Sequence, residues 1–116
     1  VLSGKYNQDP ENAEGRFATY LKSVNKRQRA MANRFMNNKT LASTQKYLGI
    51  AKRAGIDPVT LATAWSKQFD FVASTIIGAT SAEQLDPIFE AMDLELSSEV
   101  LAECNKVHDE ILYPMG

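Results

Sequence analysis

The sequence predicts an α/β protein that is mostly helical by residue count. Residues 1–6 resemble the end of a strand, and residues 71–77 (FVASTII) are a β-branched and aromatic run between Asp70 and Gly78. Helical patterns follow each of these segments, and this strand–helix order is typical of parallel strands joined by helical crossovers. Two such strands cannot form a covered sheet by themselves. The chain therefore looks like part of a larger sheet.

The clearest helical pattern covers residues 40–54, which carry an apolar stripe at helical spacing. Gly55 stands where a left-handed cap would end that helix. Asp57 and Pro58 then fit the N-cap and the first position of a second helix, because proline has no N–H group to satisfy there. We expect two consecutive helices on either side of Gly55.

The other helical segments are shorter. Residues 16–38 predict one or two short helices separated near residues 23–25. Ser81 and Gln84 fit a capping box at the start of an amphipathic helix that runs to residue 92. A last helix is expected to begin near Ser97.

The composition limits the class of protein. A chain of 116 residues makes one domain of ordinary size. No stretch approaches the roughly 18–20 apolar residues of a membrane span, so we expect no membrane partner. Cys104 has no second cysteine for an internal disulfide, and with His108 as the lone histidine no closed zinc site is expected. These features favour a reducing, cytoplasmic location.

Charge is distributed unevenly along the chain. Residues 16–56 contain ten lysines or arginines and no acid, whereas residues 57–116 contain eleven acids and two lysines. Either the basic part binds an anionic partner, or the two parts neutralise each other in the fold. No aromatic residues are interleaved with the basic ones in a stacking arrangement, which argues against nucleic acid as the partner.

Four stretches of the sequence together resemble a known family. They are residues 2–6 (LSGKY), 51–58 (AKRAGIDP), 61–65 (LATAW) and 74–85 (STIIGATSAEQL). In order and spacing they resemble the C-terminal third of the aldo-keto reductases, including the bacterial branch related to potassium-channel β subunits. Members of that family are (β/α)₈ barrels, which need about 250 residues, and they reduce aldehydes or ketones with NADPH. The resemblance implies that residues 1–116 are the last two βα units and the C-terminal helix of one such TIM-barrel domain.

The resemblance also implies that residues after the second strand bind NADP. Gly78, Thr80 and Ser81 would lie at the 2′-phosphate, where the N-terminus of the following helix favours an anion. Gln84 would lie near the adenosine. Ser81 and Gln84 equally satisfy a capping box that has no ligand, so both interpretations stay open.

A second group of implied NADP-binding residues follows the first strand. Ser3, Gly4 and Lys5 stand where the family contacts the pyrophosphate, and lysine would supply a positive charge there. Arg16 has the spacing at which related proteins place an arginine over the cofactor. The alternative for Arg16 is an exposed residue without a ligand.

Two positions depart from the family pattern. Members usually have an asparagine that contacts the adenine, often preceded by an acid, where this chain has Ile88 and Pro87. Isoleucine cannot form a hydrogen bond with adenine. We therefore expect cofactor affinity to be reduced or lost.

The family's catalytic tyrosine, lysine, aspartate and histidine belong to earlier strands, and their motifs do not occur in this chain. We expect the cofactor-binding C-terminal part of an NADP-dependent oxidoreductase, inactive alone, whose whole protein takes NADP(H) and a carbonyl substrate. The chain is then a proteolytic remnant, a partial gene product or a portion of a longer protein. A second hypothesis is a non-enzymatic module that covers its strand edges by self-association. A third is a basic, helical nucleic-acid-binding protein.

Overall fold

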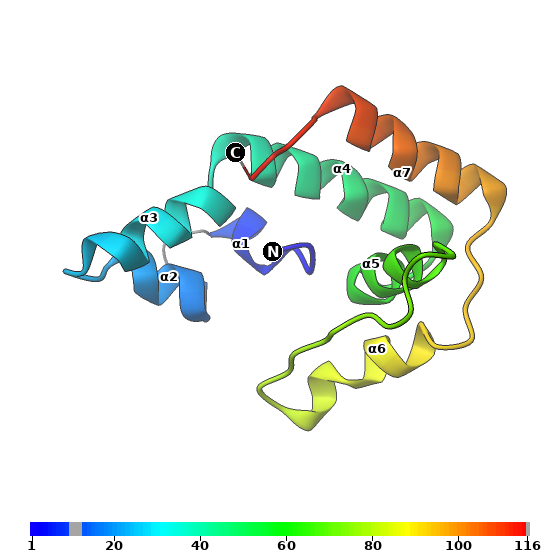
Figure 1. Ribbon diagram of the computed structural model, residues 1–116, viewed down its shortest axis with the longest axis horizontal. Coiled ribbons are helices and arrows are strands. Elements are labelled where there is room, and N and C mark those ends of the chain that lie inside the picture. The colour runs from blue at the N-terminus through cyan, green and yellow to red at the C-terminus, as the bar shows by residue number, and fades with distance from the viewer. Residues whose placement is uncertain (10–12, 116) are drawn as a thin grey trace.

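The computed structural model describes residues 1–9 and 13–115, and every regular element within these ranges is a helix (Figure 1). The α-helices are α1 (Lys5–Gln8), α2 (Arg16–Leu21), α3 (Lys26–Phe35), α4 (Asn38–Ala54), α5 (Pro58–Lys67), α6 (Asp86–Glu90) and α7 (Ser98–Glu110). A short 3₁₀-helix, η1 (Ala82–Gln84), precedes α6.

The two predicted strands do not form in the described part of the chain, so the α/β prediction was wrong for the chain as it folds here. Residues 2–4 form a turn that leads into α1, and residues 74–79 run without regular structure. The backbone of residues 74–79 makes no hydrogen bond with any described residue. A strand is stabilised by backbone hydrogen bonds to a neighbouring strand, and neither segment has such a neighbour.

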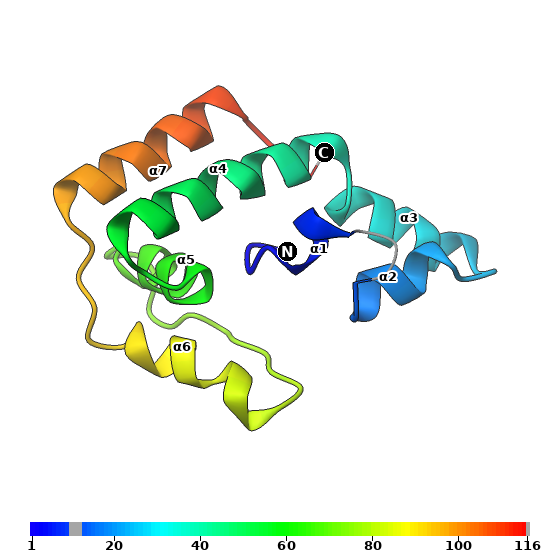
Figure 2. The ribbon, with the colours of Figure 1, turned by 180° about the vertical axis from the view of Figure 1, so that it is seen from behind.

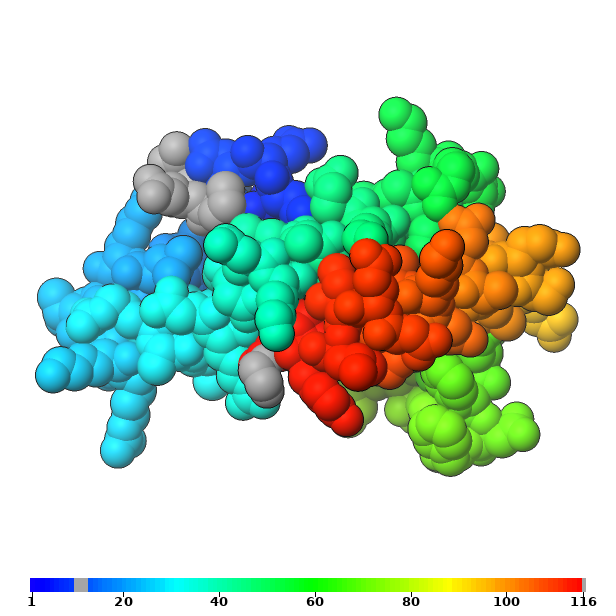
Figure 3. Space-filling view, turned by 90° about the horizontal axis from the view of Figure 1, so that it is seen from above, coloured from blue at the N-terminus to red at the C-terminus, as the bar shows by residue number. Residues whose placement is uncertain are grey.

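The long helix α4 organises the molecule. The side chain of Asn37 accepts a hydrogen bond from the Thr40 N–H at its start, and Gly55, with φ of 68°, ends it in the left-handed conformation. The helix predicted over residues 40–54 is therefore confirmed. Helices α2 and α3 gather at one end of α4 and α5 and α6 at the other, as Figures 1 and 2 show from opposite sides. Figure 3 shows α7 lying along α4 on one face.

Two further caps agree with the sequence. Asp57 Oδ1 accepts a hydrogen bond from the Val59 N–H at 2.7 Å, and Pro58 opens α5 as expected. Ser97 Oγ accepts one from the Val100 N–H at 3.3 Å at the start of α7. The expected division of residues 16–38 into two short helices is also confirmed by α2 and α3.

The amphipathic helix expected from Ser81 to residue 92 is interrupted. Pro87 has no N–H group that could bond the carbonyl of Glu83, so η1 ends and α6 begins around the proline. The Ser81 side chain makes no hydrogen bond that caps η1. The predicted single capped helix was wrong for this reason.

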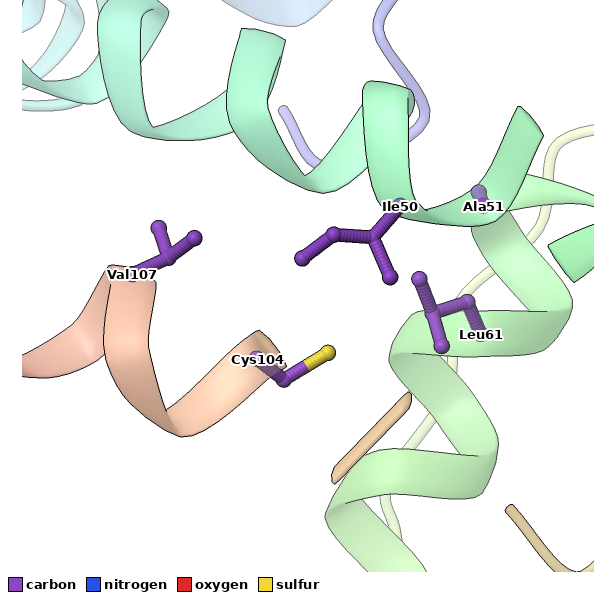
Figure 4. Packing of buried hydrophobic residues seen from close by; sticks show 5 residues of the cluster. All are labelled: Ile50, Ala51, Leu61, Cys104 and Val107. Carbon is purple, nitrogen blue, oxygen red and sulfur yellow. The ribbon is translucent and has the colours of Figure 1, made fainter. Parts of the chain in front are cut away.

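Two hydrophobic clusters share α4. Figure 4 shows the first, in which side chains from α4, α5 and α7 meet: Ile50, Ala51, Leu61, Cys104 and Val107. The second is built by α1, α2 and α3 from Tyr6, Phe17, Ala18 and Ala32. Leu41, near the beginning of α4, packs against this second cluster. One helix therefore contributes to both cores.

Ion pairs between α4 and α7 account for part of the charge asymmetry. Lys46 Nζ lies 2.6 Å from Glu110 Oε1, and Arg53 pairs with Glu103. The hydrogen bond from Lys46 lowers the pKa of Glu110. Both pairs are solvent-exposed and contribute little to stability. Neutralisation within the fold thus holds for Lys46 and Arg53 of α4, whereas no cation of α2 or α3 forms an ion pair with a described residue.

Candidate functional site

An open cleft of about 940 Å³ lies between the N-terminal residues, the start of α2 and the segment before η1. Its size falls within the range of small-molecule sites, roughly 300–1,000 Å³. The three segments come from distant parts of the sequence. The lining residues are Val1, Lys5, Tyr6, Ala13, Glu14, Gly15, Arg16, Phe17, Gly78, Ala79, Thr80 and Gln84.

Two cations stand on one side of this cleft. Lys5 is the first residue of α1, which begins after Gly4 in the left-handed conformation (φ 80°). Arg16 is the first residue of α2. Both side chains are exposed, and neither forms an ion pair with any residue that the structure describes. Glu14 also lines the cleft, so two positive charges stand against one acid there, and this excess of positive charge attracts an anionic ligand.

The segment before and within η1 also lines the cleft, through Gly78, Ala79, Thr80 and Gln84. Gln84 Oε1 accepts a hydrogen bond from the Thr80 N–H at 3.0 Å, and Gln84 Nε2 donates one to Thr80 Oγ1 at 3.1 Å. These two bonds close a turn across η1. Gly78 has no heavy atom within 4 Å of the place where a Cβ would stand, so a ligand can approach its backbone.

The structure brings five of the eight predicted NADP-binding residues to this one cleft: Lys5, Arg16, Gly78, Thr80 and Gln84. Ser3 and Gly4 line a neighbouring hollow of about 410 Å³, which Lys5 also lines. Ser81 lines neither cavity. Members of both predicted groups therefore share one cleft, whereas Ser3, Gly4 and Ser81 lie outside it.

Ser81 has a different partner from the one that a capping box requires. The backbone N–H of Glu83 and the Ser81 hydroxyl both donate to the Glu83 carboxylate, which lowers the pKa of Glu83. The expected helix N-terminus is also reduced to the three residues of η1. The positive charge at this cleft accordingly comes from Lys5 and Arg16 more than from a helix dipole.

Sequence reasoning missed several lining residues. Glu14 and Ala13 lie in a connection of polar sequence that carries no periodic signal. Tyr6 and Phe17 follow the two cations directly, and both are buried, at 2% and 8% exposure. In the sequence, a cation directly precedes an aromatic residue in both places, at Lys5-Tyr6 and at Arg16-Phe17. This repeated pair was the signal that could have indicated these lining residues.

The described residues form neither a metal site nor a membrane-spanning helix. No group of three or more histidine, cysteine, aspartate or glutamate side chains stands together there as a metal site would require. None of the helices in these ranges has the length and apolar character that crossing a membrane demands.

Comparison with known proteins identifies the family. The sequence profile of the Aldo/keto reductase family matches residues 2–109. Protein tas of Escherichia coli (strain K12) and Protein tas of Shigella flexneri are each 35% identical to this chain over 114 residues. The match covers 98% of this chain and 30% of each relative, so the chain spans about 30% of the length of these curated relatives. Because the family profile covers nearly all of its residues, this chain belongs to the aldo/keto reductase family.

Proposed function

We propose that this chain is the part of an NADP-dependent aldo-keto reductase that holds the phosphate groups and adenosine of the cofactor. Members of the family typically use NAD(P)H. When bound, NADPH supplies a hydride to an aldehyde or ketone. The residues of this chain bind and orient the cofactor and leave the chemistry to other parts of the whole protein.

The observation that carries this proposal is the convergence of two distant segments on one cleft. Lys5 and Arg16 supply positive charge from one side, and Gly78 and Thr80 supply an open backbone and a hydroxyl group from the other. Phosphate groups are recognised by charge-assisted hydrogen bonds of this kind. A ligand with phosphates near an adenosine matches both sides of the cleft.

The two residues that depart from the family pattern, Pro87 and Ile88, both belong to α6. The Pro87 carbonyl accepts a hydrogen bond from Thr60 Oγ1 at 2.7 Å, which attaches α6 to α5. Ile88, on α6, offers no hydrogen bond to an adenine. We therefore propose that phosphate contacts supply most of the affinity and that the adenine contributes less than the family pattern implies.

Substitution of the two cations tests this proposal. Lys5→Met and Arg16→Met each remove one charged donor while keeping the length of an unbranched side chain. Each is expected to weaken NADPH binding about tenfold or more, because a hydrogen bond to a charged group contributes roughly 1.5–3 kcal/mol. Fluorescence titration of NADPH with the full chain at low salt measures the affinity.

Lys52→Met is the matched control, since Lys52 is an exposed cation in the last turn of α4 and lines neither hollow at the N-terminal end. The control is expected to bind NADPH like the wild type. NADH, which lacks the 2′-phosphate, should bind more weakly than NADPH. Absence of saturable binding by the wild type, or equal affinity in all variants, would refute the proposal.

A second candidate function is self-association, favoured by the segment between α5 and η1. The backbone of residues 74–79 is unpaired within the described residues, and Phe71 and Ile76 are 83% and 97% exposed. The run FVASTII has no charge and no proline, which is typical of segments that pair between chains. A second copy is the occupant that fits this segment, because an uncharged run meets no like-charge repulsion from itself.

Ile76→Lys tests self-association. A charge at this position is expected to shift the chain from oligomer to monomer, because pairing would bring two lysines together. Sedimentation velocity at micromolar concentrations measures the change. Val24→Lys is the control, since Val24 is 96% exposed outside this segment. A wild-type chain that sediments as a compact monomer would exclude this candidate.

A further inference from the structure

The two cations of the cleft are each held over the ring of the following residue. Lys5 Nζ lies 5.1 Å from the centroid of the Tyr6 ring, and Arg16 Cζ lies 5.0 Å from the centroid of the Phe17 ring. Such cation–π contacts restrict where a long side chain can point. The position of each charge therefore depends on the position of a buried ring.

A hydrogen bond joins the two rings. The Phe17 N–H donates to Tyr6 Oη at 3.4 Å in the buried second cluster. The ring centroids are 6.0 Å apart, and Phe17 in turn stacks on Phe35 of α3 at 4.8 Å. Tyr6 thus connects α1, which carries Lys5, to the first turn of α2, which carries Arg16.

Gly15 permits this connection. Its φ of 144° is a conformation that residues with a side chain rarely adopt. A Cβ at this position would lie 2.6 Å from Tyr6 Oη and 2.7 Å from Lys5 Nζ, closer than atoms in contact can approach. Only glycine lets the chain pass between the tyrosine hydroxyl and the lysine and enter α2 at this point.

We infer that Tyr6 is a positioning residue for the anion site. Its hydroxyl group, bonded to the Phe17 N–H across Gly15, holds Arg16 beside Lys5, so that one phosphate-bearing ligand meets both charges. This inference deepens the proposed function and rests on it. Filling the core explains the Tyr6 ring, which a phenylalanine would supply equally well. The hydroxyl group accepts a hydrogen bond from a first-turn N–H of α2, and that bond is the contact through which Tyr6 would fix the start of α2.

Tyr6→Phe isolates that role, because it removes the hydroxyl group and keeps the ring. NADPH affinity is expected to fall about 3- to 10-fold, the range that follows from losing one neutral hydrogen bond. Tyr20→Phe is the control, since Tyr20 is a half-buried residue of α2 that packs against the same cluster. It is expected to leave the affinity unchanged. Thermal unfolding of both variants shows whether the fold is retained.

A double-mutant cycle distinguishes positioning from a merely structural effect. If Tyr6 acts through Arg16, then Tyr6→Phe in the Arg16→Met background changes NADPH affinity less than about twofold, because the residue it positions is gone. A structural effect would lower affinity equally in both backgrounds. Gly15→Ala, if it folds, is expected to reproduce the weaker binding of Tyr6→Phe.

The outcomes separate the two proposals. A wild-type chain that does not bind NADPH refutes the proposed function itself. A wild-type chain that binds NADPH while Tyr6→Phe binds equally well refutes only the role of Tyr6. Equal losses in the wild-type and Arg16→Met backgrounds also refute the positioning role.

Discussion

In the presence of an aldehyde, NADPH is expected to disappear no faster with the purified chain than in buffer alone. Hydride transfer requires a carbonyl group that an acid polarises and protonates, and removing such an acid typically lowers the rate roughly 10²–10⁴-fold. The predicted residues that converge on the cleft are two cations, a glycine, a threonine and a glutamine, and Glu14 and the buried Tyr6 also line it. Under the proposed function these residues bind the cofactor, and the acid that protonates the carbonyl group comes from another part of the whole protein.

The assay follows NADPH absorbance with a reactive aldehyde, using a chain purified free of host reductases. A buffer blank and the Lys5→Met/Arg16→Met chain, purified identically, serve as controls. Equal, background rates in all three are the expected result. Turnover that is present in the wild type and lost in the double variant would show that this chain carries catalytic residues of its own.

Leu61→Ala is expected to destabilise the chain by about 2–5 kcal/mol, the usual cost of truncating a buried leucine. Leu61 is 3% exposed at the centre of the first cluster. It also lines an apolar cavity of about 100 Å³ together with Tyr47, Trp65 and Cys104. The neighbours have not closed this space in the native fold, so truncation enlarges it. Chemical denaturation followed by circular dichroism measures the loss.

Cys104 provides an independent measurement of the same effect. Burial raises the pKa of its thiol, and the nearby Glu103 carboxylate raises it further. The folded chain should therefore react slowly with a thiol reagent, and the Leu61→Ala chain faster, because it opens more often. Leu112→Ala is the control, since Leu112 is 51% exposed and its truncation should cost no more than about 0.5 kcal/mol. A loss below about 1 kcal/mol for Leu61→Ala would contradict the description of this core.

The helices that the sequence predicted well are those whose ends carry their own signals. Gly55, Asp57 and Ser97 form the caps that their positions indicated. Such caps are local interactions, and they do not depend on what the rest of the protein supplies. Pro87 carried an equally local signal against a continuous helix, and its effect on residues 81–92 was underestimated.

The strands could not be predicted in the same way, because a strand requires a partner. Residues 71–77 have the composition of a buried strand, and their neighbour would have to come from another segment or another chain. Within the described residues no segment pairs with them. The composition therefore indicated a preference for a strand, but this segment forms no strand because it has no neighbouring strand to pair with.

The family resemblance predicted those residues of the candidate site that belong to its two motifs. Lys5, Arg16, Gly78, Thr80 and Gln84 were selected from two separate motifs and line one cleft. Their binding of NADP remains a prediction. The contacts that hold the two cations, through Tyr6 and Gly15, depend on a close approach between α1 and α2 that no periodic pattern in the sequence reveals.

The sharing of α4 by both hydrophobic clusters has a consequence for how the molecule folds. Leu41 near one end of the helix packs with α1 to α3, and Ile50 near the other packs with α5 and α7. Neither half of the chain retains a complete core once this helix unwinds, so the two ends should lose their structure in one cooperative transition. A substitution inside α4 far from the cleft therefore changes how often the cleft is assembled, even though it contacts none of the residues that line it.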